Sequence, residues 1–280
     1  MPKNSLLPEA ATITKIINET ASGDVKTFHV LFDEPGRQES FAYRSGQCAM
    51  VSLLGFGESM ISITQTPTRS KERLEFTIKN AGRHTGALHL VEEGQKIGLR
   101  GPYGNSFPME EFQGKNIVFI AGGFALAPAR SVINNVLDNR SNYGHVDIIY
   151  GARTPGDLCF KYELLENWTQ YPDTNVQVTV DKGDESWTGP VGFVPAFTEQ
   201  IAPSPKDAVA IICGPPIMIK FTLQTMAKLG FAEDQIYTTL EMKMQCGVGK
   251  CGRCNIGEKY VCVDGPVFNF SQLKTMPQEF

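Results

Sequence analysis

No apolar run in this 280-residue sequence approaches the length of a membrane-spanning helix, and the first ten residues lack the apolar core of a secretory signal. The formal net charge is only −4, so no excess of one sign points to nucleic acid or to an anionic membrane. Internal repeats and low-complexity segments are also missing. These absences predict a protein with no membrane span and no nucleic-acid partner.

Cysteine is sparse outside one short stretch of the sequence. Cys48, Cys159 and Cys213 are scattered in apolar contexts, where buried free thiols are common. The other four of the seven cysteines follow the pattern C-x4-C-x2-C-x7-C: Cys246, Cys251, Cys254 and Cys262. Because this usage does not indicate a disulfide framework, we expect a reducing, cytoplasmic location.

The cysteine stretch, QCGVGKCGRCNIGEKYVC, has the chemistry of a soft metal centre. Its leading C-x4-C-x2-C spacing is that of plant-type [2Fe–2S] proteins, and the glycines between the cysteines permit close approach of backbone N–H groups to sulfur. A structural zinc site is the alternative. Zinc sites commonly use two C-x2-C pairs, and the second pair is missing here. The pattern favours an iron–sulfur cluster.

The sequence pattern changes twice along the chain, which divides it into three regions. Residues 1–111 alternate short β-like runs with turns, which predicts a small antiparallel barrel. Residues 112–235 alternate strands with helical stretches, which predicts a parallel sheet covered on both faces. Residues 236–280 hold a last strand and the cysteine stretch. The expected fold is therefore a β barrel followed by an α/β domain and a C-terminal metal-binding loop.

Two turns in the second region suit a phosphate-bearing ligand. Gly122 and Gly123 end an apolar strand, and Pro128 lies in the first turn of the following helix. Free N–H groups at such a helix start stabilise a pyrophosphate. However, GGFALAP is not a full G-x-G-x-x-G, because Ala125 stands where a third glycine is expected. A tight turn without a ligand therefore stays open as an alternative.

The second turn, CGPPIM, also joins a buried strand to a helix, at the sheet edge where α/β proteins bind ligands. Arg153 follows another strand and suits a nucleotide ribose phosphate or adenine, or else a solvated surface position. In the first region, GESMISI and IKNAGRHTGALH offer hydroxyls, glycines and a cation for a phosphate. Each of these segments alone is equally typical of turn chemistry.

With these motifs together, the chain resembles the ferredoxin–NADP reductase superfamily. It is most similar to the iron–sulfur branch, which includes sulfhydrogenase gamma subunits, one of the subunits of anaerobic sulfite reductase and the electron-transfer subunit of dihydroorotate dehydrogenase. The resemblance covers roughly residues 8–270 and is carried by RGPYGNSFP, CGPPIM, GKCGRC and YVCVDGPVF. It implies an FAD-binding barrel at 1–111, an NAD(P)-binding domain at 112–235 and a [2Fe–2S] segment at 236–280.

The resemblance also implies site residues. The expected FAD contacts are Ser59, Met60, Ile61, Ser62, Thr77, Ile78, Lys79, Gly82, His84 and Thr85. The expected NAD(P) contacts are Gly122, Gly123, Ala127, Pro128, Arg153, Gly214, Pro215 and Met218. Cys213 is the candidate catalytic side chain beside the hydride path.

The expected function is an NAD(P)H-dependent, diaphorase-type oxidoreductase subunit. It would move electrons between NAD(P)H, FAD and a [2Fe–2S] cluster, to or from a partner redox subunit of a hydrogenase, a sulfite reductase or a heterodisulfide-reductase-like complex. One alternative is a flavin–cluster relay in dihydroorotate dehydrogenase without strong NAD(P) binding. Another is a non-catalytic assembly module stapled by zinc.

Overall fold

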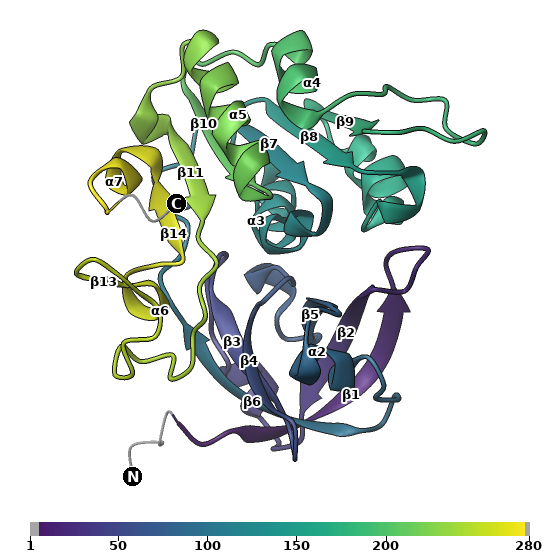
Figure 1. The fold of residues 1–280 in the computed structure, drawn as a ribbon, viewed down its shortest axis with the longest axis vertical. Helices are drawn as coiled ribbons and strands as arrows, with labels where there is room; N and C mark the ends of the chain where they lie inside the picture. Colours follow the sequence, from purple (N-terminus) through teal and green to yellow (C-terminus); the bar gives the residue numbers. More distant parts are fainter. Residues whose placement is uncertain (1–5, 278–280) are drawn as a thin grey trace.

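A computed structural model of the protein describes residues 6–277 and has two lobes, one built on each of two six-stranded sheets (Figure 1). The first sheet is antiparallel, with the strand order β4-β3-β6-β1-β2-β5. Its strands are β1 (Glu9–Asn18), β2 (Val25–Phe32), β3 (Cys48–Leu53), β4 (Gly57–Ser62), β5 (Leu74–Lys79) and β6 (Lys96–Tyr103). One bridge between Ile63 and Phe76 brings the two edges together. The sheet is therefore barrel-like but not closed.

Alternation of side chains explains why this sheet curls around a core. In β1, Ala11 and Ile13 are buried, whereas the residues between and beside them are more exposed. In β2, Phe28 and Val30 contribute to the same apolar interior. The short helices of this lobe are α1 (Arg37–Ser40) and α2 (Arg83–Leu88). The predicted antiparallel barrel is confirmed, as an open one.

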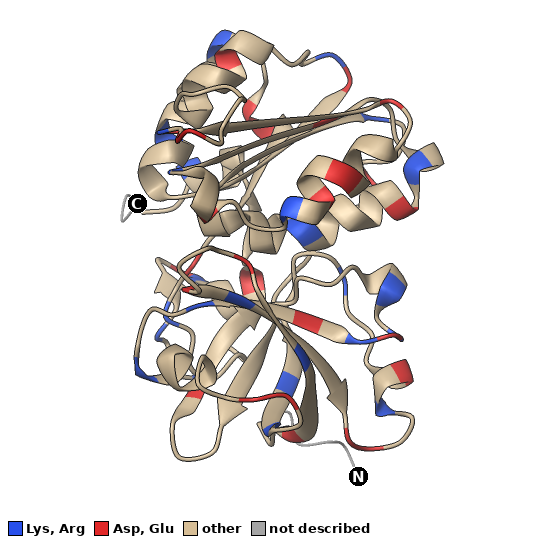
Figure 2. Ribbon diagram, turned by 90° about the vertical axis from the view of Figure 1, so that its right-hand side faces the viewer, with Lys and Arg blue, Asp and Glu red and all other residues tan. Residues whose placement is uncertain are grey.

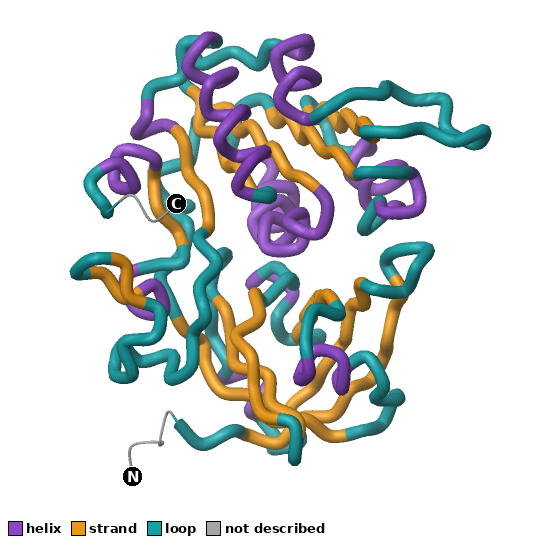
Figure 3. Tube along the Cα trace, viewed as in Figure 1, coloured by secondary structure: helices purple, strands orange, loops and turns teal. Residues whose placement is uncertain are grey.

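The second lobe is a parallel sheet with one antiparallel edge strand, in the order β14-β11-β10-β7-β8-β9. Its strands are β7 (Asn116–Gly122), β8 (Val146–Ala152), β9 (Thr174–Val180), β10 (Ala208–Cys213), β11 (Ile236–Thr239) and β14 (Val267–Asn269). The larger helices are α3 (Leu126–Asp138), α4 (Val194–Ile201) and α5 (Pro216–Lys228), and Figure 3 shows them on both faces of the sheet. The α/β prediction is confirmed.

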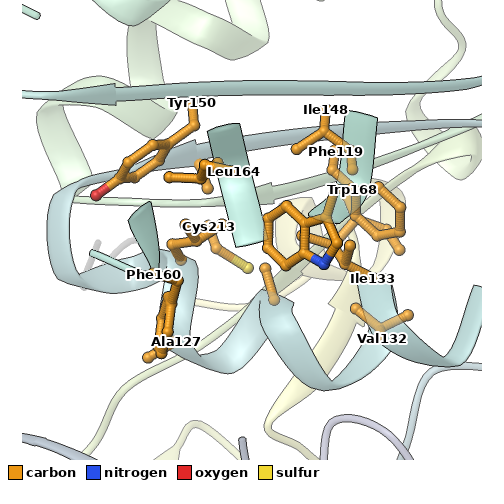
Figure 4. Close-up of a cluster of buried hydrophobic side chains, with 14 of the residues drawn as sticks. Phe119, Ala127, Val132, Ile133, Ile148, Tyr150, Phe160, Leu164, Trp168 and Cys213 are labelled. Carbon is orange, nitrogen blue, oxygen red and sulfur yellow. The ribbon is translucent and has the colours of Figure 1, made fainter. Parts of the chain in front are cut away.

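The core of the second lobe lies between the sheet and its covering helices. On one face, Trp168 and Phe119 pack with residues of α3, including Ile133 (Figure 4). On the other face, Phe197 of α4 and Met226 of α5 pack against the sheet. Charged residues of both signs are scattered over the two lobes, as Figure 2 shows. Within residues 6–277, every helix is too short or too polar to cross a bilayer.

The C-terminal segment is threaded through the second lobe. β11 pairs with β10, and β14 pairs with β11, so both strands complete the second sheet. Between them, residues 240–266 leave the sheet and form a small unit with β12 (Asn255–Ile256), β13 (Lys259–Tyr260) and α6 (Val261–Asp264). This unit lies beside the barrel strands in Figure 1. Helix α7 (Phe270–Lys274) follows β14 and is the last element among the described residues.

Some elements differ from the sequence pattern. Residues 57–62 form β4, an edge strand whose mixed GESMIS sequence has no apolar alternation. Helix α4 follows loop-like residues, and Pro195 in its first turn is a local helix-start signal. In DLCFKYELLENW, one of the helical stretches between strands, the helix begins only at residue 161. It continues through a π-helical turn, Glu163–Asn167, into a 3-10 turn, Trp168–Gln170.

A buried ion network joins the two lobes. Arg130 of α3 donates through Nε to Glu163 at 2.6 Å and through a terminal nitrogen to Glu75 of β5 at 2.5 Å. The same guanidinium reaches the carbonyl of Thr64 at 3.3 Å. Burial raises the pKa of the Glu75 carboxyl, but the charge and hydrogen bond of Arg130, together with the charges of His29 and Arg73, outweigh burial and lower the pKa. The network therefore fixes the barrel-like lobe against the second lobe.

Arg130→Leu should lower the free energy of unfolding by about 3–5 kcal/mol, because it leaves Glu163 without its cation and leaves the buried Glu75 paired only with the more exposed Arg73 and with His29. Urea unfolding of the full chain measures this. Arg69→Leu is the matched control, since Arg69 also crosses between the lobes, to Asp138, but is more exposed. That variant should cost about 1 kcal/mol or less. Equal losses from the two variants would contradict the account.

Candidate redox site

Glycines shape the cysteine loop. Gly247, Gly249, Gly252 and Gly257 all have φ between 55° and 79°, in the left-handed region that favours glycine. The turns aim backbone N–H groups at sulfur. Cys246 Sγ accepts from the N–H groups of Val248, Lys250 and Cys251, at 3.4, 3.3 and 3.5 Å. Cys262 Sγ accepts from the N–H of Gly249 at 3.3 Å. The loop therefore presents donors to two sulfurs at once.

The four thiols of the loop interact with one another. The Cys246 thiol interacts with that of Cys251, and the Cys262 thiol interacts with those of Cys254 and Cys246. Partial burial raises the pKa of Cys246, but its N–H donors outweigh burial and bring the pKa down to about 6. Burial raises the pKa of Cys262 to about 12. Among residues 6–277, no three Cys, His, Asp or Glu side chains converge as ligands of a single ion.

The four cysteines differ in their exposure to solvent. Cys254 and Cys262 are buried in a small apolar cluster with Ile256 and Val261, whereas Cys251 is exposed. One side of the loop therefore faces solvent, and the other faces protein. These donors fit a group that binds thiolates, accepts N–H hydrogen bonds on sulfur and lies near the surface.

The link RGPYGNSFP attaches this loop to the barrel. Asn105 Nδ2 donates to the carbonyls of Asp264 and Val267 at 2.9 and 2.7 Å, and its Oδ1 accepts from the N–H of Val267 at 2.9 Å. A Cβ on Gly104 would meet the carbonyl oxygen of Gly265 at 2.6 Å, so this position requires glycine. The sequence predicts only a turn-rich link here. The structure shows that Asn105 ties this link both to the end of α6 and to the start of β14.

A cavity of about 990 Å³ lies at the carboxyl edge of the parallel sheet. Five strand ends contribute to its wall, and barrel residues close the opposite side. The wall includes Gly122 to Ala125 after β7, Gly151 to Arg153 around the end of β8, Asp181 after β9, Gly214 to Met218 after β10, Glu241 after β11, and Thr20, Asp24, Val25 and Lys79 from the barrel. This is the edge where open α/β sheets bind ligands, and the volume suits a dinucleotide.

The two predicted turns meet at this cavity. A Cβ on Gly122 would lie 2.3 Å from Met218 Sδ, so the first turn and the start of α5 are in close contact. Gly123 has φ of 56°, and a Cβ there would enter open space. Ala125 precedes α3 with an ordinary φ of −71°. Gly123 therefore leaves its part of the turn open to the cavity, while Phe124 and Ala125 line the wall beside it.

Three predicted nucleotide-site residues lie elsewhere in the described structure. Ala127 is fully buried within α3, and neither it nor Pro128 is part of the cavity wall. Cys213 is 2% exposed and lies among apolar side chains (Figure 4). Burial raises the pKa of this thiol to about 11, and its sulfur is 3.7 Å from the hydroxyl of Thr239. Cys213 is thus held as a neutral thiol.

The wall also contains residues that the sequence did not indicate. Phe193, Ile217 and Phe221 are exposed apolar side chains on the wall, and Lys228 brings a cation. They come from the start of α4 and from α5. Exposed aromatic residues in flanking turns are the signal that could have found them. Arg153, by contrast, was predicted and does lie on the wall, with 76% of its side chain exposed.

The predicted flavin residues gather on β4, β5 and the start of α2. His84 Nδ1 is 2.8 Å from the hydroxyl of Ser59. His84 Nε2 is buried and has no hydrogen-bond partner among the described residues. Burial lowers the pKa of His84, and the nearby Glu58 carboxylate opposes that shift. An orphaned ring nitrogen beside a glycine turn fits a missing phosphate-bearing group.

The other predicted flavin residues divide by position. Thr77 is buried, and its hydroxyl lies 2.9 Å from that of Thr27. Thr85 Oγ1 accepts from the N–H of Ala81 at 3.0 Å and so closes its own turn. Lys79, at the end of β5, reaches the wall of the nucleotide cavity. The remaining predicted residues lie on or beside the same three elements: Met60, Ile61, Ser62, Ile78 and Gly82.

Known proteins match both halves of this arrangement. Residues 119–224 match the family described as an oxidoreductase NAD-binding domain, and residues 241–274 match the iron–sulfur cluster binding domain of dihydroorotate dehydrogenase B. The chain is 36% identical over 258 residues to sulfhydrogenase 1 subunit gamma of Pyrococcus furiosus, covering 90% of the chain and 88% of the relative. It is 30% identical over 270 residues to a probable dihydroorotate dehydrogenase B (NAD(+)) electron transfer subunit of Methanocaldococcus jannaschii, covering 95% and 91%.

Solved structures share the fold. The structure of an NADH-dependent reduced ferredoxin–NADP oxidoreductase superposes with a TM-score of 0.74 at 23% identity, covering 100% of this chain and 95% of that one. A ferredoxin–NADP⁺ reductase from Neisseria gonorrhoeae, solved with FAD and NADP, gives a TM-score of 0.67 at 20% identity, covering 82% and 96%.

The observed sheets, the family matches and the relatives agree with the predicted family, electron-transfer role and cofactor classes: a flavin, a nicotinamide nucleotide and an iron–sulfur cluster. The chain belongs to the ferredoxin–NADP reductase superfamily, in the iron–sulfur branch that contains sulfhydrogenase gamma and dihydroorotate dehydrogenase electron-transfer subunits, and is an NAD(P)H-dependent oxidoreductase subunit.

Proposed function

We propose that the chain moves electrons between NAD(P)H, FAD and a [2Fe–2S] cluster, and exchanges them with a partner redox subunit. When bound, the nicotinamide supplies a hydride carrying two electrons, and the flavin accepts both and releases them one at a time to the cluster. One observation carries the proposal. The elements proposed to hold FAD would lie between the other two sites, because Lys79 of β5 reaches the cavity wall, and Met60 of β4 packs against the same apolar cluster as Val248 of the cysteine loop.

The first assignment concerns the type of iron–sulfur cluster. We assign the Cys246–Cys251 pair to one iron and the Cys254–Cys262 pair to the other. A two-iron centre would take two of the four sulfurs on each iron. The C-x4-C-x2-C spacing and the backbone N–H donors to Cys246 and Cys262 support [2Fe–2S] over the zinc-stapled assembly module.

We further propose roles for the chain's own residues. Ser59 to Ser62, Thr77 to Lys79 and the turn at Gly82, His84 and Thr85 would hold FAD. His84, through its unpartnered Nε2, would meet the pyrophosphate. Gly122, Gly123, Gly214, Pro215, Met218 and Arg153 would hold the nucleotide, with Ala127 and Pro128 supporting the turn from within α3. Cys213, as a neutral buried thiol, would border the nicotinamide without acting as a base.

The proposed division is 1–111 for flavin, 112–235 for the nucleotide and 236–280 for the cluster. The partner is a redox subunit, as the names of the hydrogenase and dihydroorotate dehydrogenase relatives indicate for those proteins. The match of residues 241–274 to the dihydroorotate dehydrogenase cluster domain supports a second candidate partner, a dihydroorotate-oxidising subunit. Seven free cysteines in the structure support a reducing compartment, the cytoplasm.

Anaerobic purification of the full chain tests these cofactor assignments. We expect two irons and two sulfides per chain, and one FAD released on denaturation. The orphaned His84 nitrogen and the glycine turn are the reasons to expect a flavin that carries a pyrophosphate. Release of FMN instead would contradict the FAD assignment. Stoichiometric zinc without sulfide would contradict the cluster assignment and favour the assembly module.

A further inference from the structure

Arg100 of β6 is a buried cation whose donors are all engaged. The residue is 4% exposed. Its Nε donates to Glu58 at 2.9 Å, and one terminal nitrogen donates to the hydroxyl of Tyr103 at 3.0 Å and to the carbonyl of Cys246 at 2.6 Å. The other terminal nitrogen donates to the carbonyl of Gln245 at 3.0 Å and again to Glu58. The five N–H groups of a guanidinium are thus accounted for.

This pattern requires an arginine. The carboxylate of Glu58 binds one edge of the guanidinium, while two consecutive carbonyls, Gln245 and Cys246, bind its far side. A planar fork of fixed geometry can make these contacts together, whereas a lysine ammonium is a point charge with three donors. The ion pair with Glu58 offsets the cost of burying the charge.

The two ends of this arrangement belong to different redox sites. Glu58 directly precedes Ser59 in β4, the strand proposed to face the flavin. Cys246 is the first of the four cysteines of the cluster loop. Beside this contact, Met60 of β4 and Val248 of the loop both pack against an apolar cluster that includes Tyr103 of β6. Polar and apolar contacts therefore hold the start of the loop against the flavin strand.

We propose that Arg100 is a positioning residue, which fixes the cluster loop at a set distance and orientation from the flavin strand. This role rests on the proposed function. It identifies Arg100 as the contact that would couple the flavin strand to the cluster loop. Electron transfer depends steeply on separation, so a loop free to shift would slow transfer while each cofactor stayed bound. The residue touches no cofactor in this role and acts through the backbone of Gln245 and Cys246.

Arg100→Lys in the full chain tests the proposal. We expect NADH to bleach the flavin at the wild-type rate, while flavin-to-cluster transfer slows on the order of tenfold, as misplacement of reacting groups does. The visible circular dichroism of the cluster should change as well, because the loop would no longer be held in one geometry. Unchanged transfer together with unchanged dichroism would overturn the proposal.

A control variant separates the position of the loop from the loss of a single hydrogen bond. Tyr103→Phe removes one acceptor of the Arg100 guanidinium but leaves the two carbonyl contacts and the Glu58 ion pair available. This variant should keep near-wild-type transfer. A slowing in Tyr103→Phe as large as in Arg100→Lys would overturn the positioning role, and so would loss of the flavin from Arg100→Lys.

Proteolysis of the metal-free chain tests the role of Arg100 independently of the proposed electron transfer. In chain stripped of metal, trypsin should cut after Lys250 and Arg253 faster in Arg100→Lys than in wild type or Tyr103→Phe, because the loop has lost its anchor. Equal cleavage rates would contradict the inference. Absence of any iron–sulfur cluster from anaerobically purified wild-type chain would instead contradict the proposed function.

Discussion

Cys254→Ser should abolish the iron–sulfur cluster, lowering iron from two per chain to nearly none, while the flavin stays bound. Cys254 is buried beside Cys262, in the apolar cluster that closes the inner side of the loop. A serine there supplies a hard oxygen ligand in place of a soft thiolate, which iron–sulfur centres disfavour. Iron and sulfide analysis with the visible spectrum measures the loss.

Cys48→Ser is the matched control for this loss. Cys48 is another buried thiol and packs in the apolar cluster that contacts Val248 of the loop, but its sulfur donates to the carbonyl of Tyr103 at 3.6 Å. A serine hydroxyl can keep that hydrogen bond. We expect full iron and sulfide in this variant. Retention of the cluster in Cys254→Ser, or its loss from both variants alike, would contradict the ligand assignment.

Gly123→Val should remove nucleotide binding, with flavin and cluster retained. Gly123 has φ of 56°, where a side chain costs about 1–2 kcal/mol, and valine is stiff as well. Its Cβ would project into the open cavity rather than against protein. We expect Kd for NADH or NADPH to rise at least about tenfold, equivalent to ~1.4 kcal/mol. Anaerobic titration followed by flavin bleaching measures Kd.

Ala125→Gly is the control in the same turn. Ala125 lies on the cavity wall with an ordinary φ of −71°, so glycine there relieves no strain and removes only a methyl group. Binding should tighten or stay unchanged. If Gly123→Val binds nucleotide like the wild type, the turn does not carry the pyrophosphate, and the chain is a flavin–cluster relay.

Local patterns predicted much of the fold. The spacing from Cys246 to Cys262, the turns at Gly123 and Gly214 and the alternation at the start of β1 each depend on neighbouring residues, so the sequence displays them directly. Contacts between distant segments left no such signal. Arg100 binds carbonyls 145 and 146 positions away, and RGPYGNSFP alone predicts only turns.

Edge and surface elements escaped prediction for a related reason. β4 is an edge strand, and its sequence serves a site more than a core, so apolar alternation is weak. Cys213, by contrast, ends the buried strand β10, and its apolar context already indicated the burial that the structure shows. Phe193 and Phe221 reach the cavity only because α4 and α5 come together beside the sheet.

The central claim is that electrons pass from nicotinamide through flavin to the cluster within this chain. Anaerobic rapid mixing of the full chain with NADH, and separately with NADPH, tests it most directly. We predict flavin bleaching followed by loss of the oxidised cluster band, with at least one of the two nucleotides. If neither nucleotide bleaches the flavin, even with the partner subunits present, the claim is wrong.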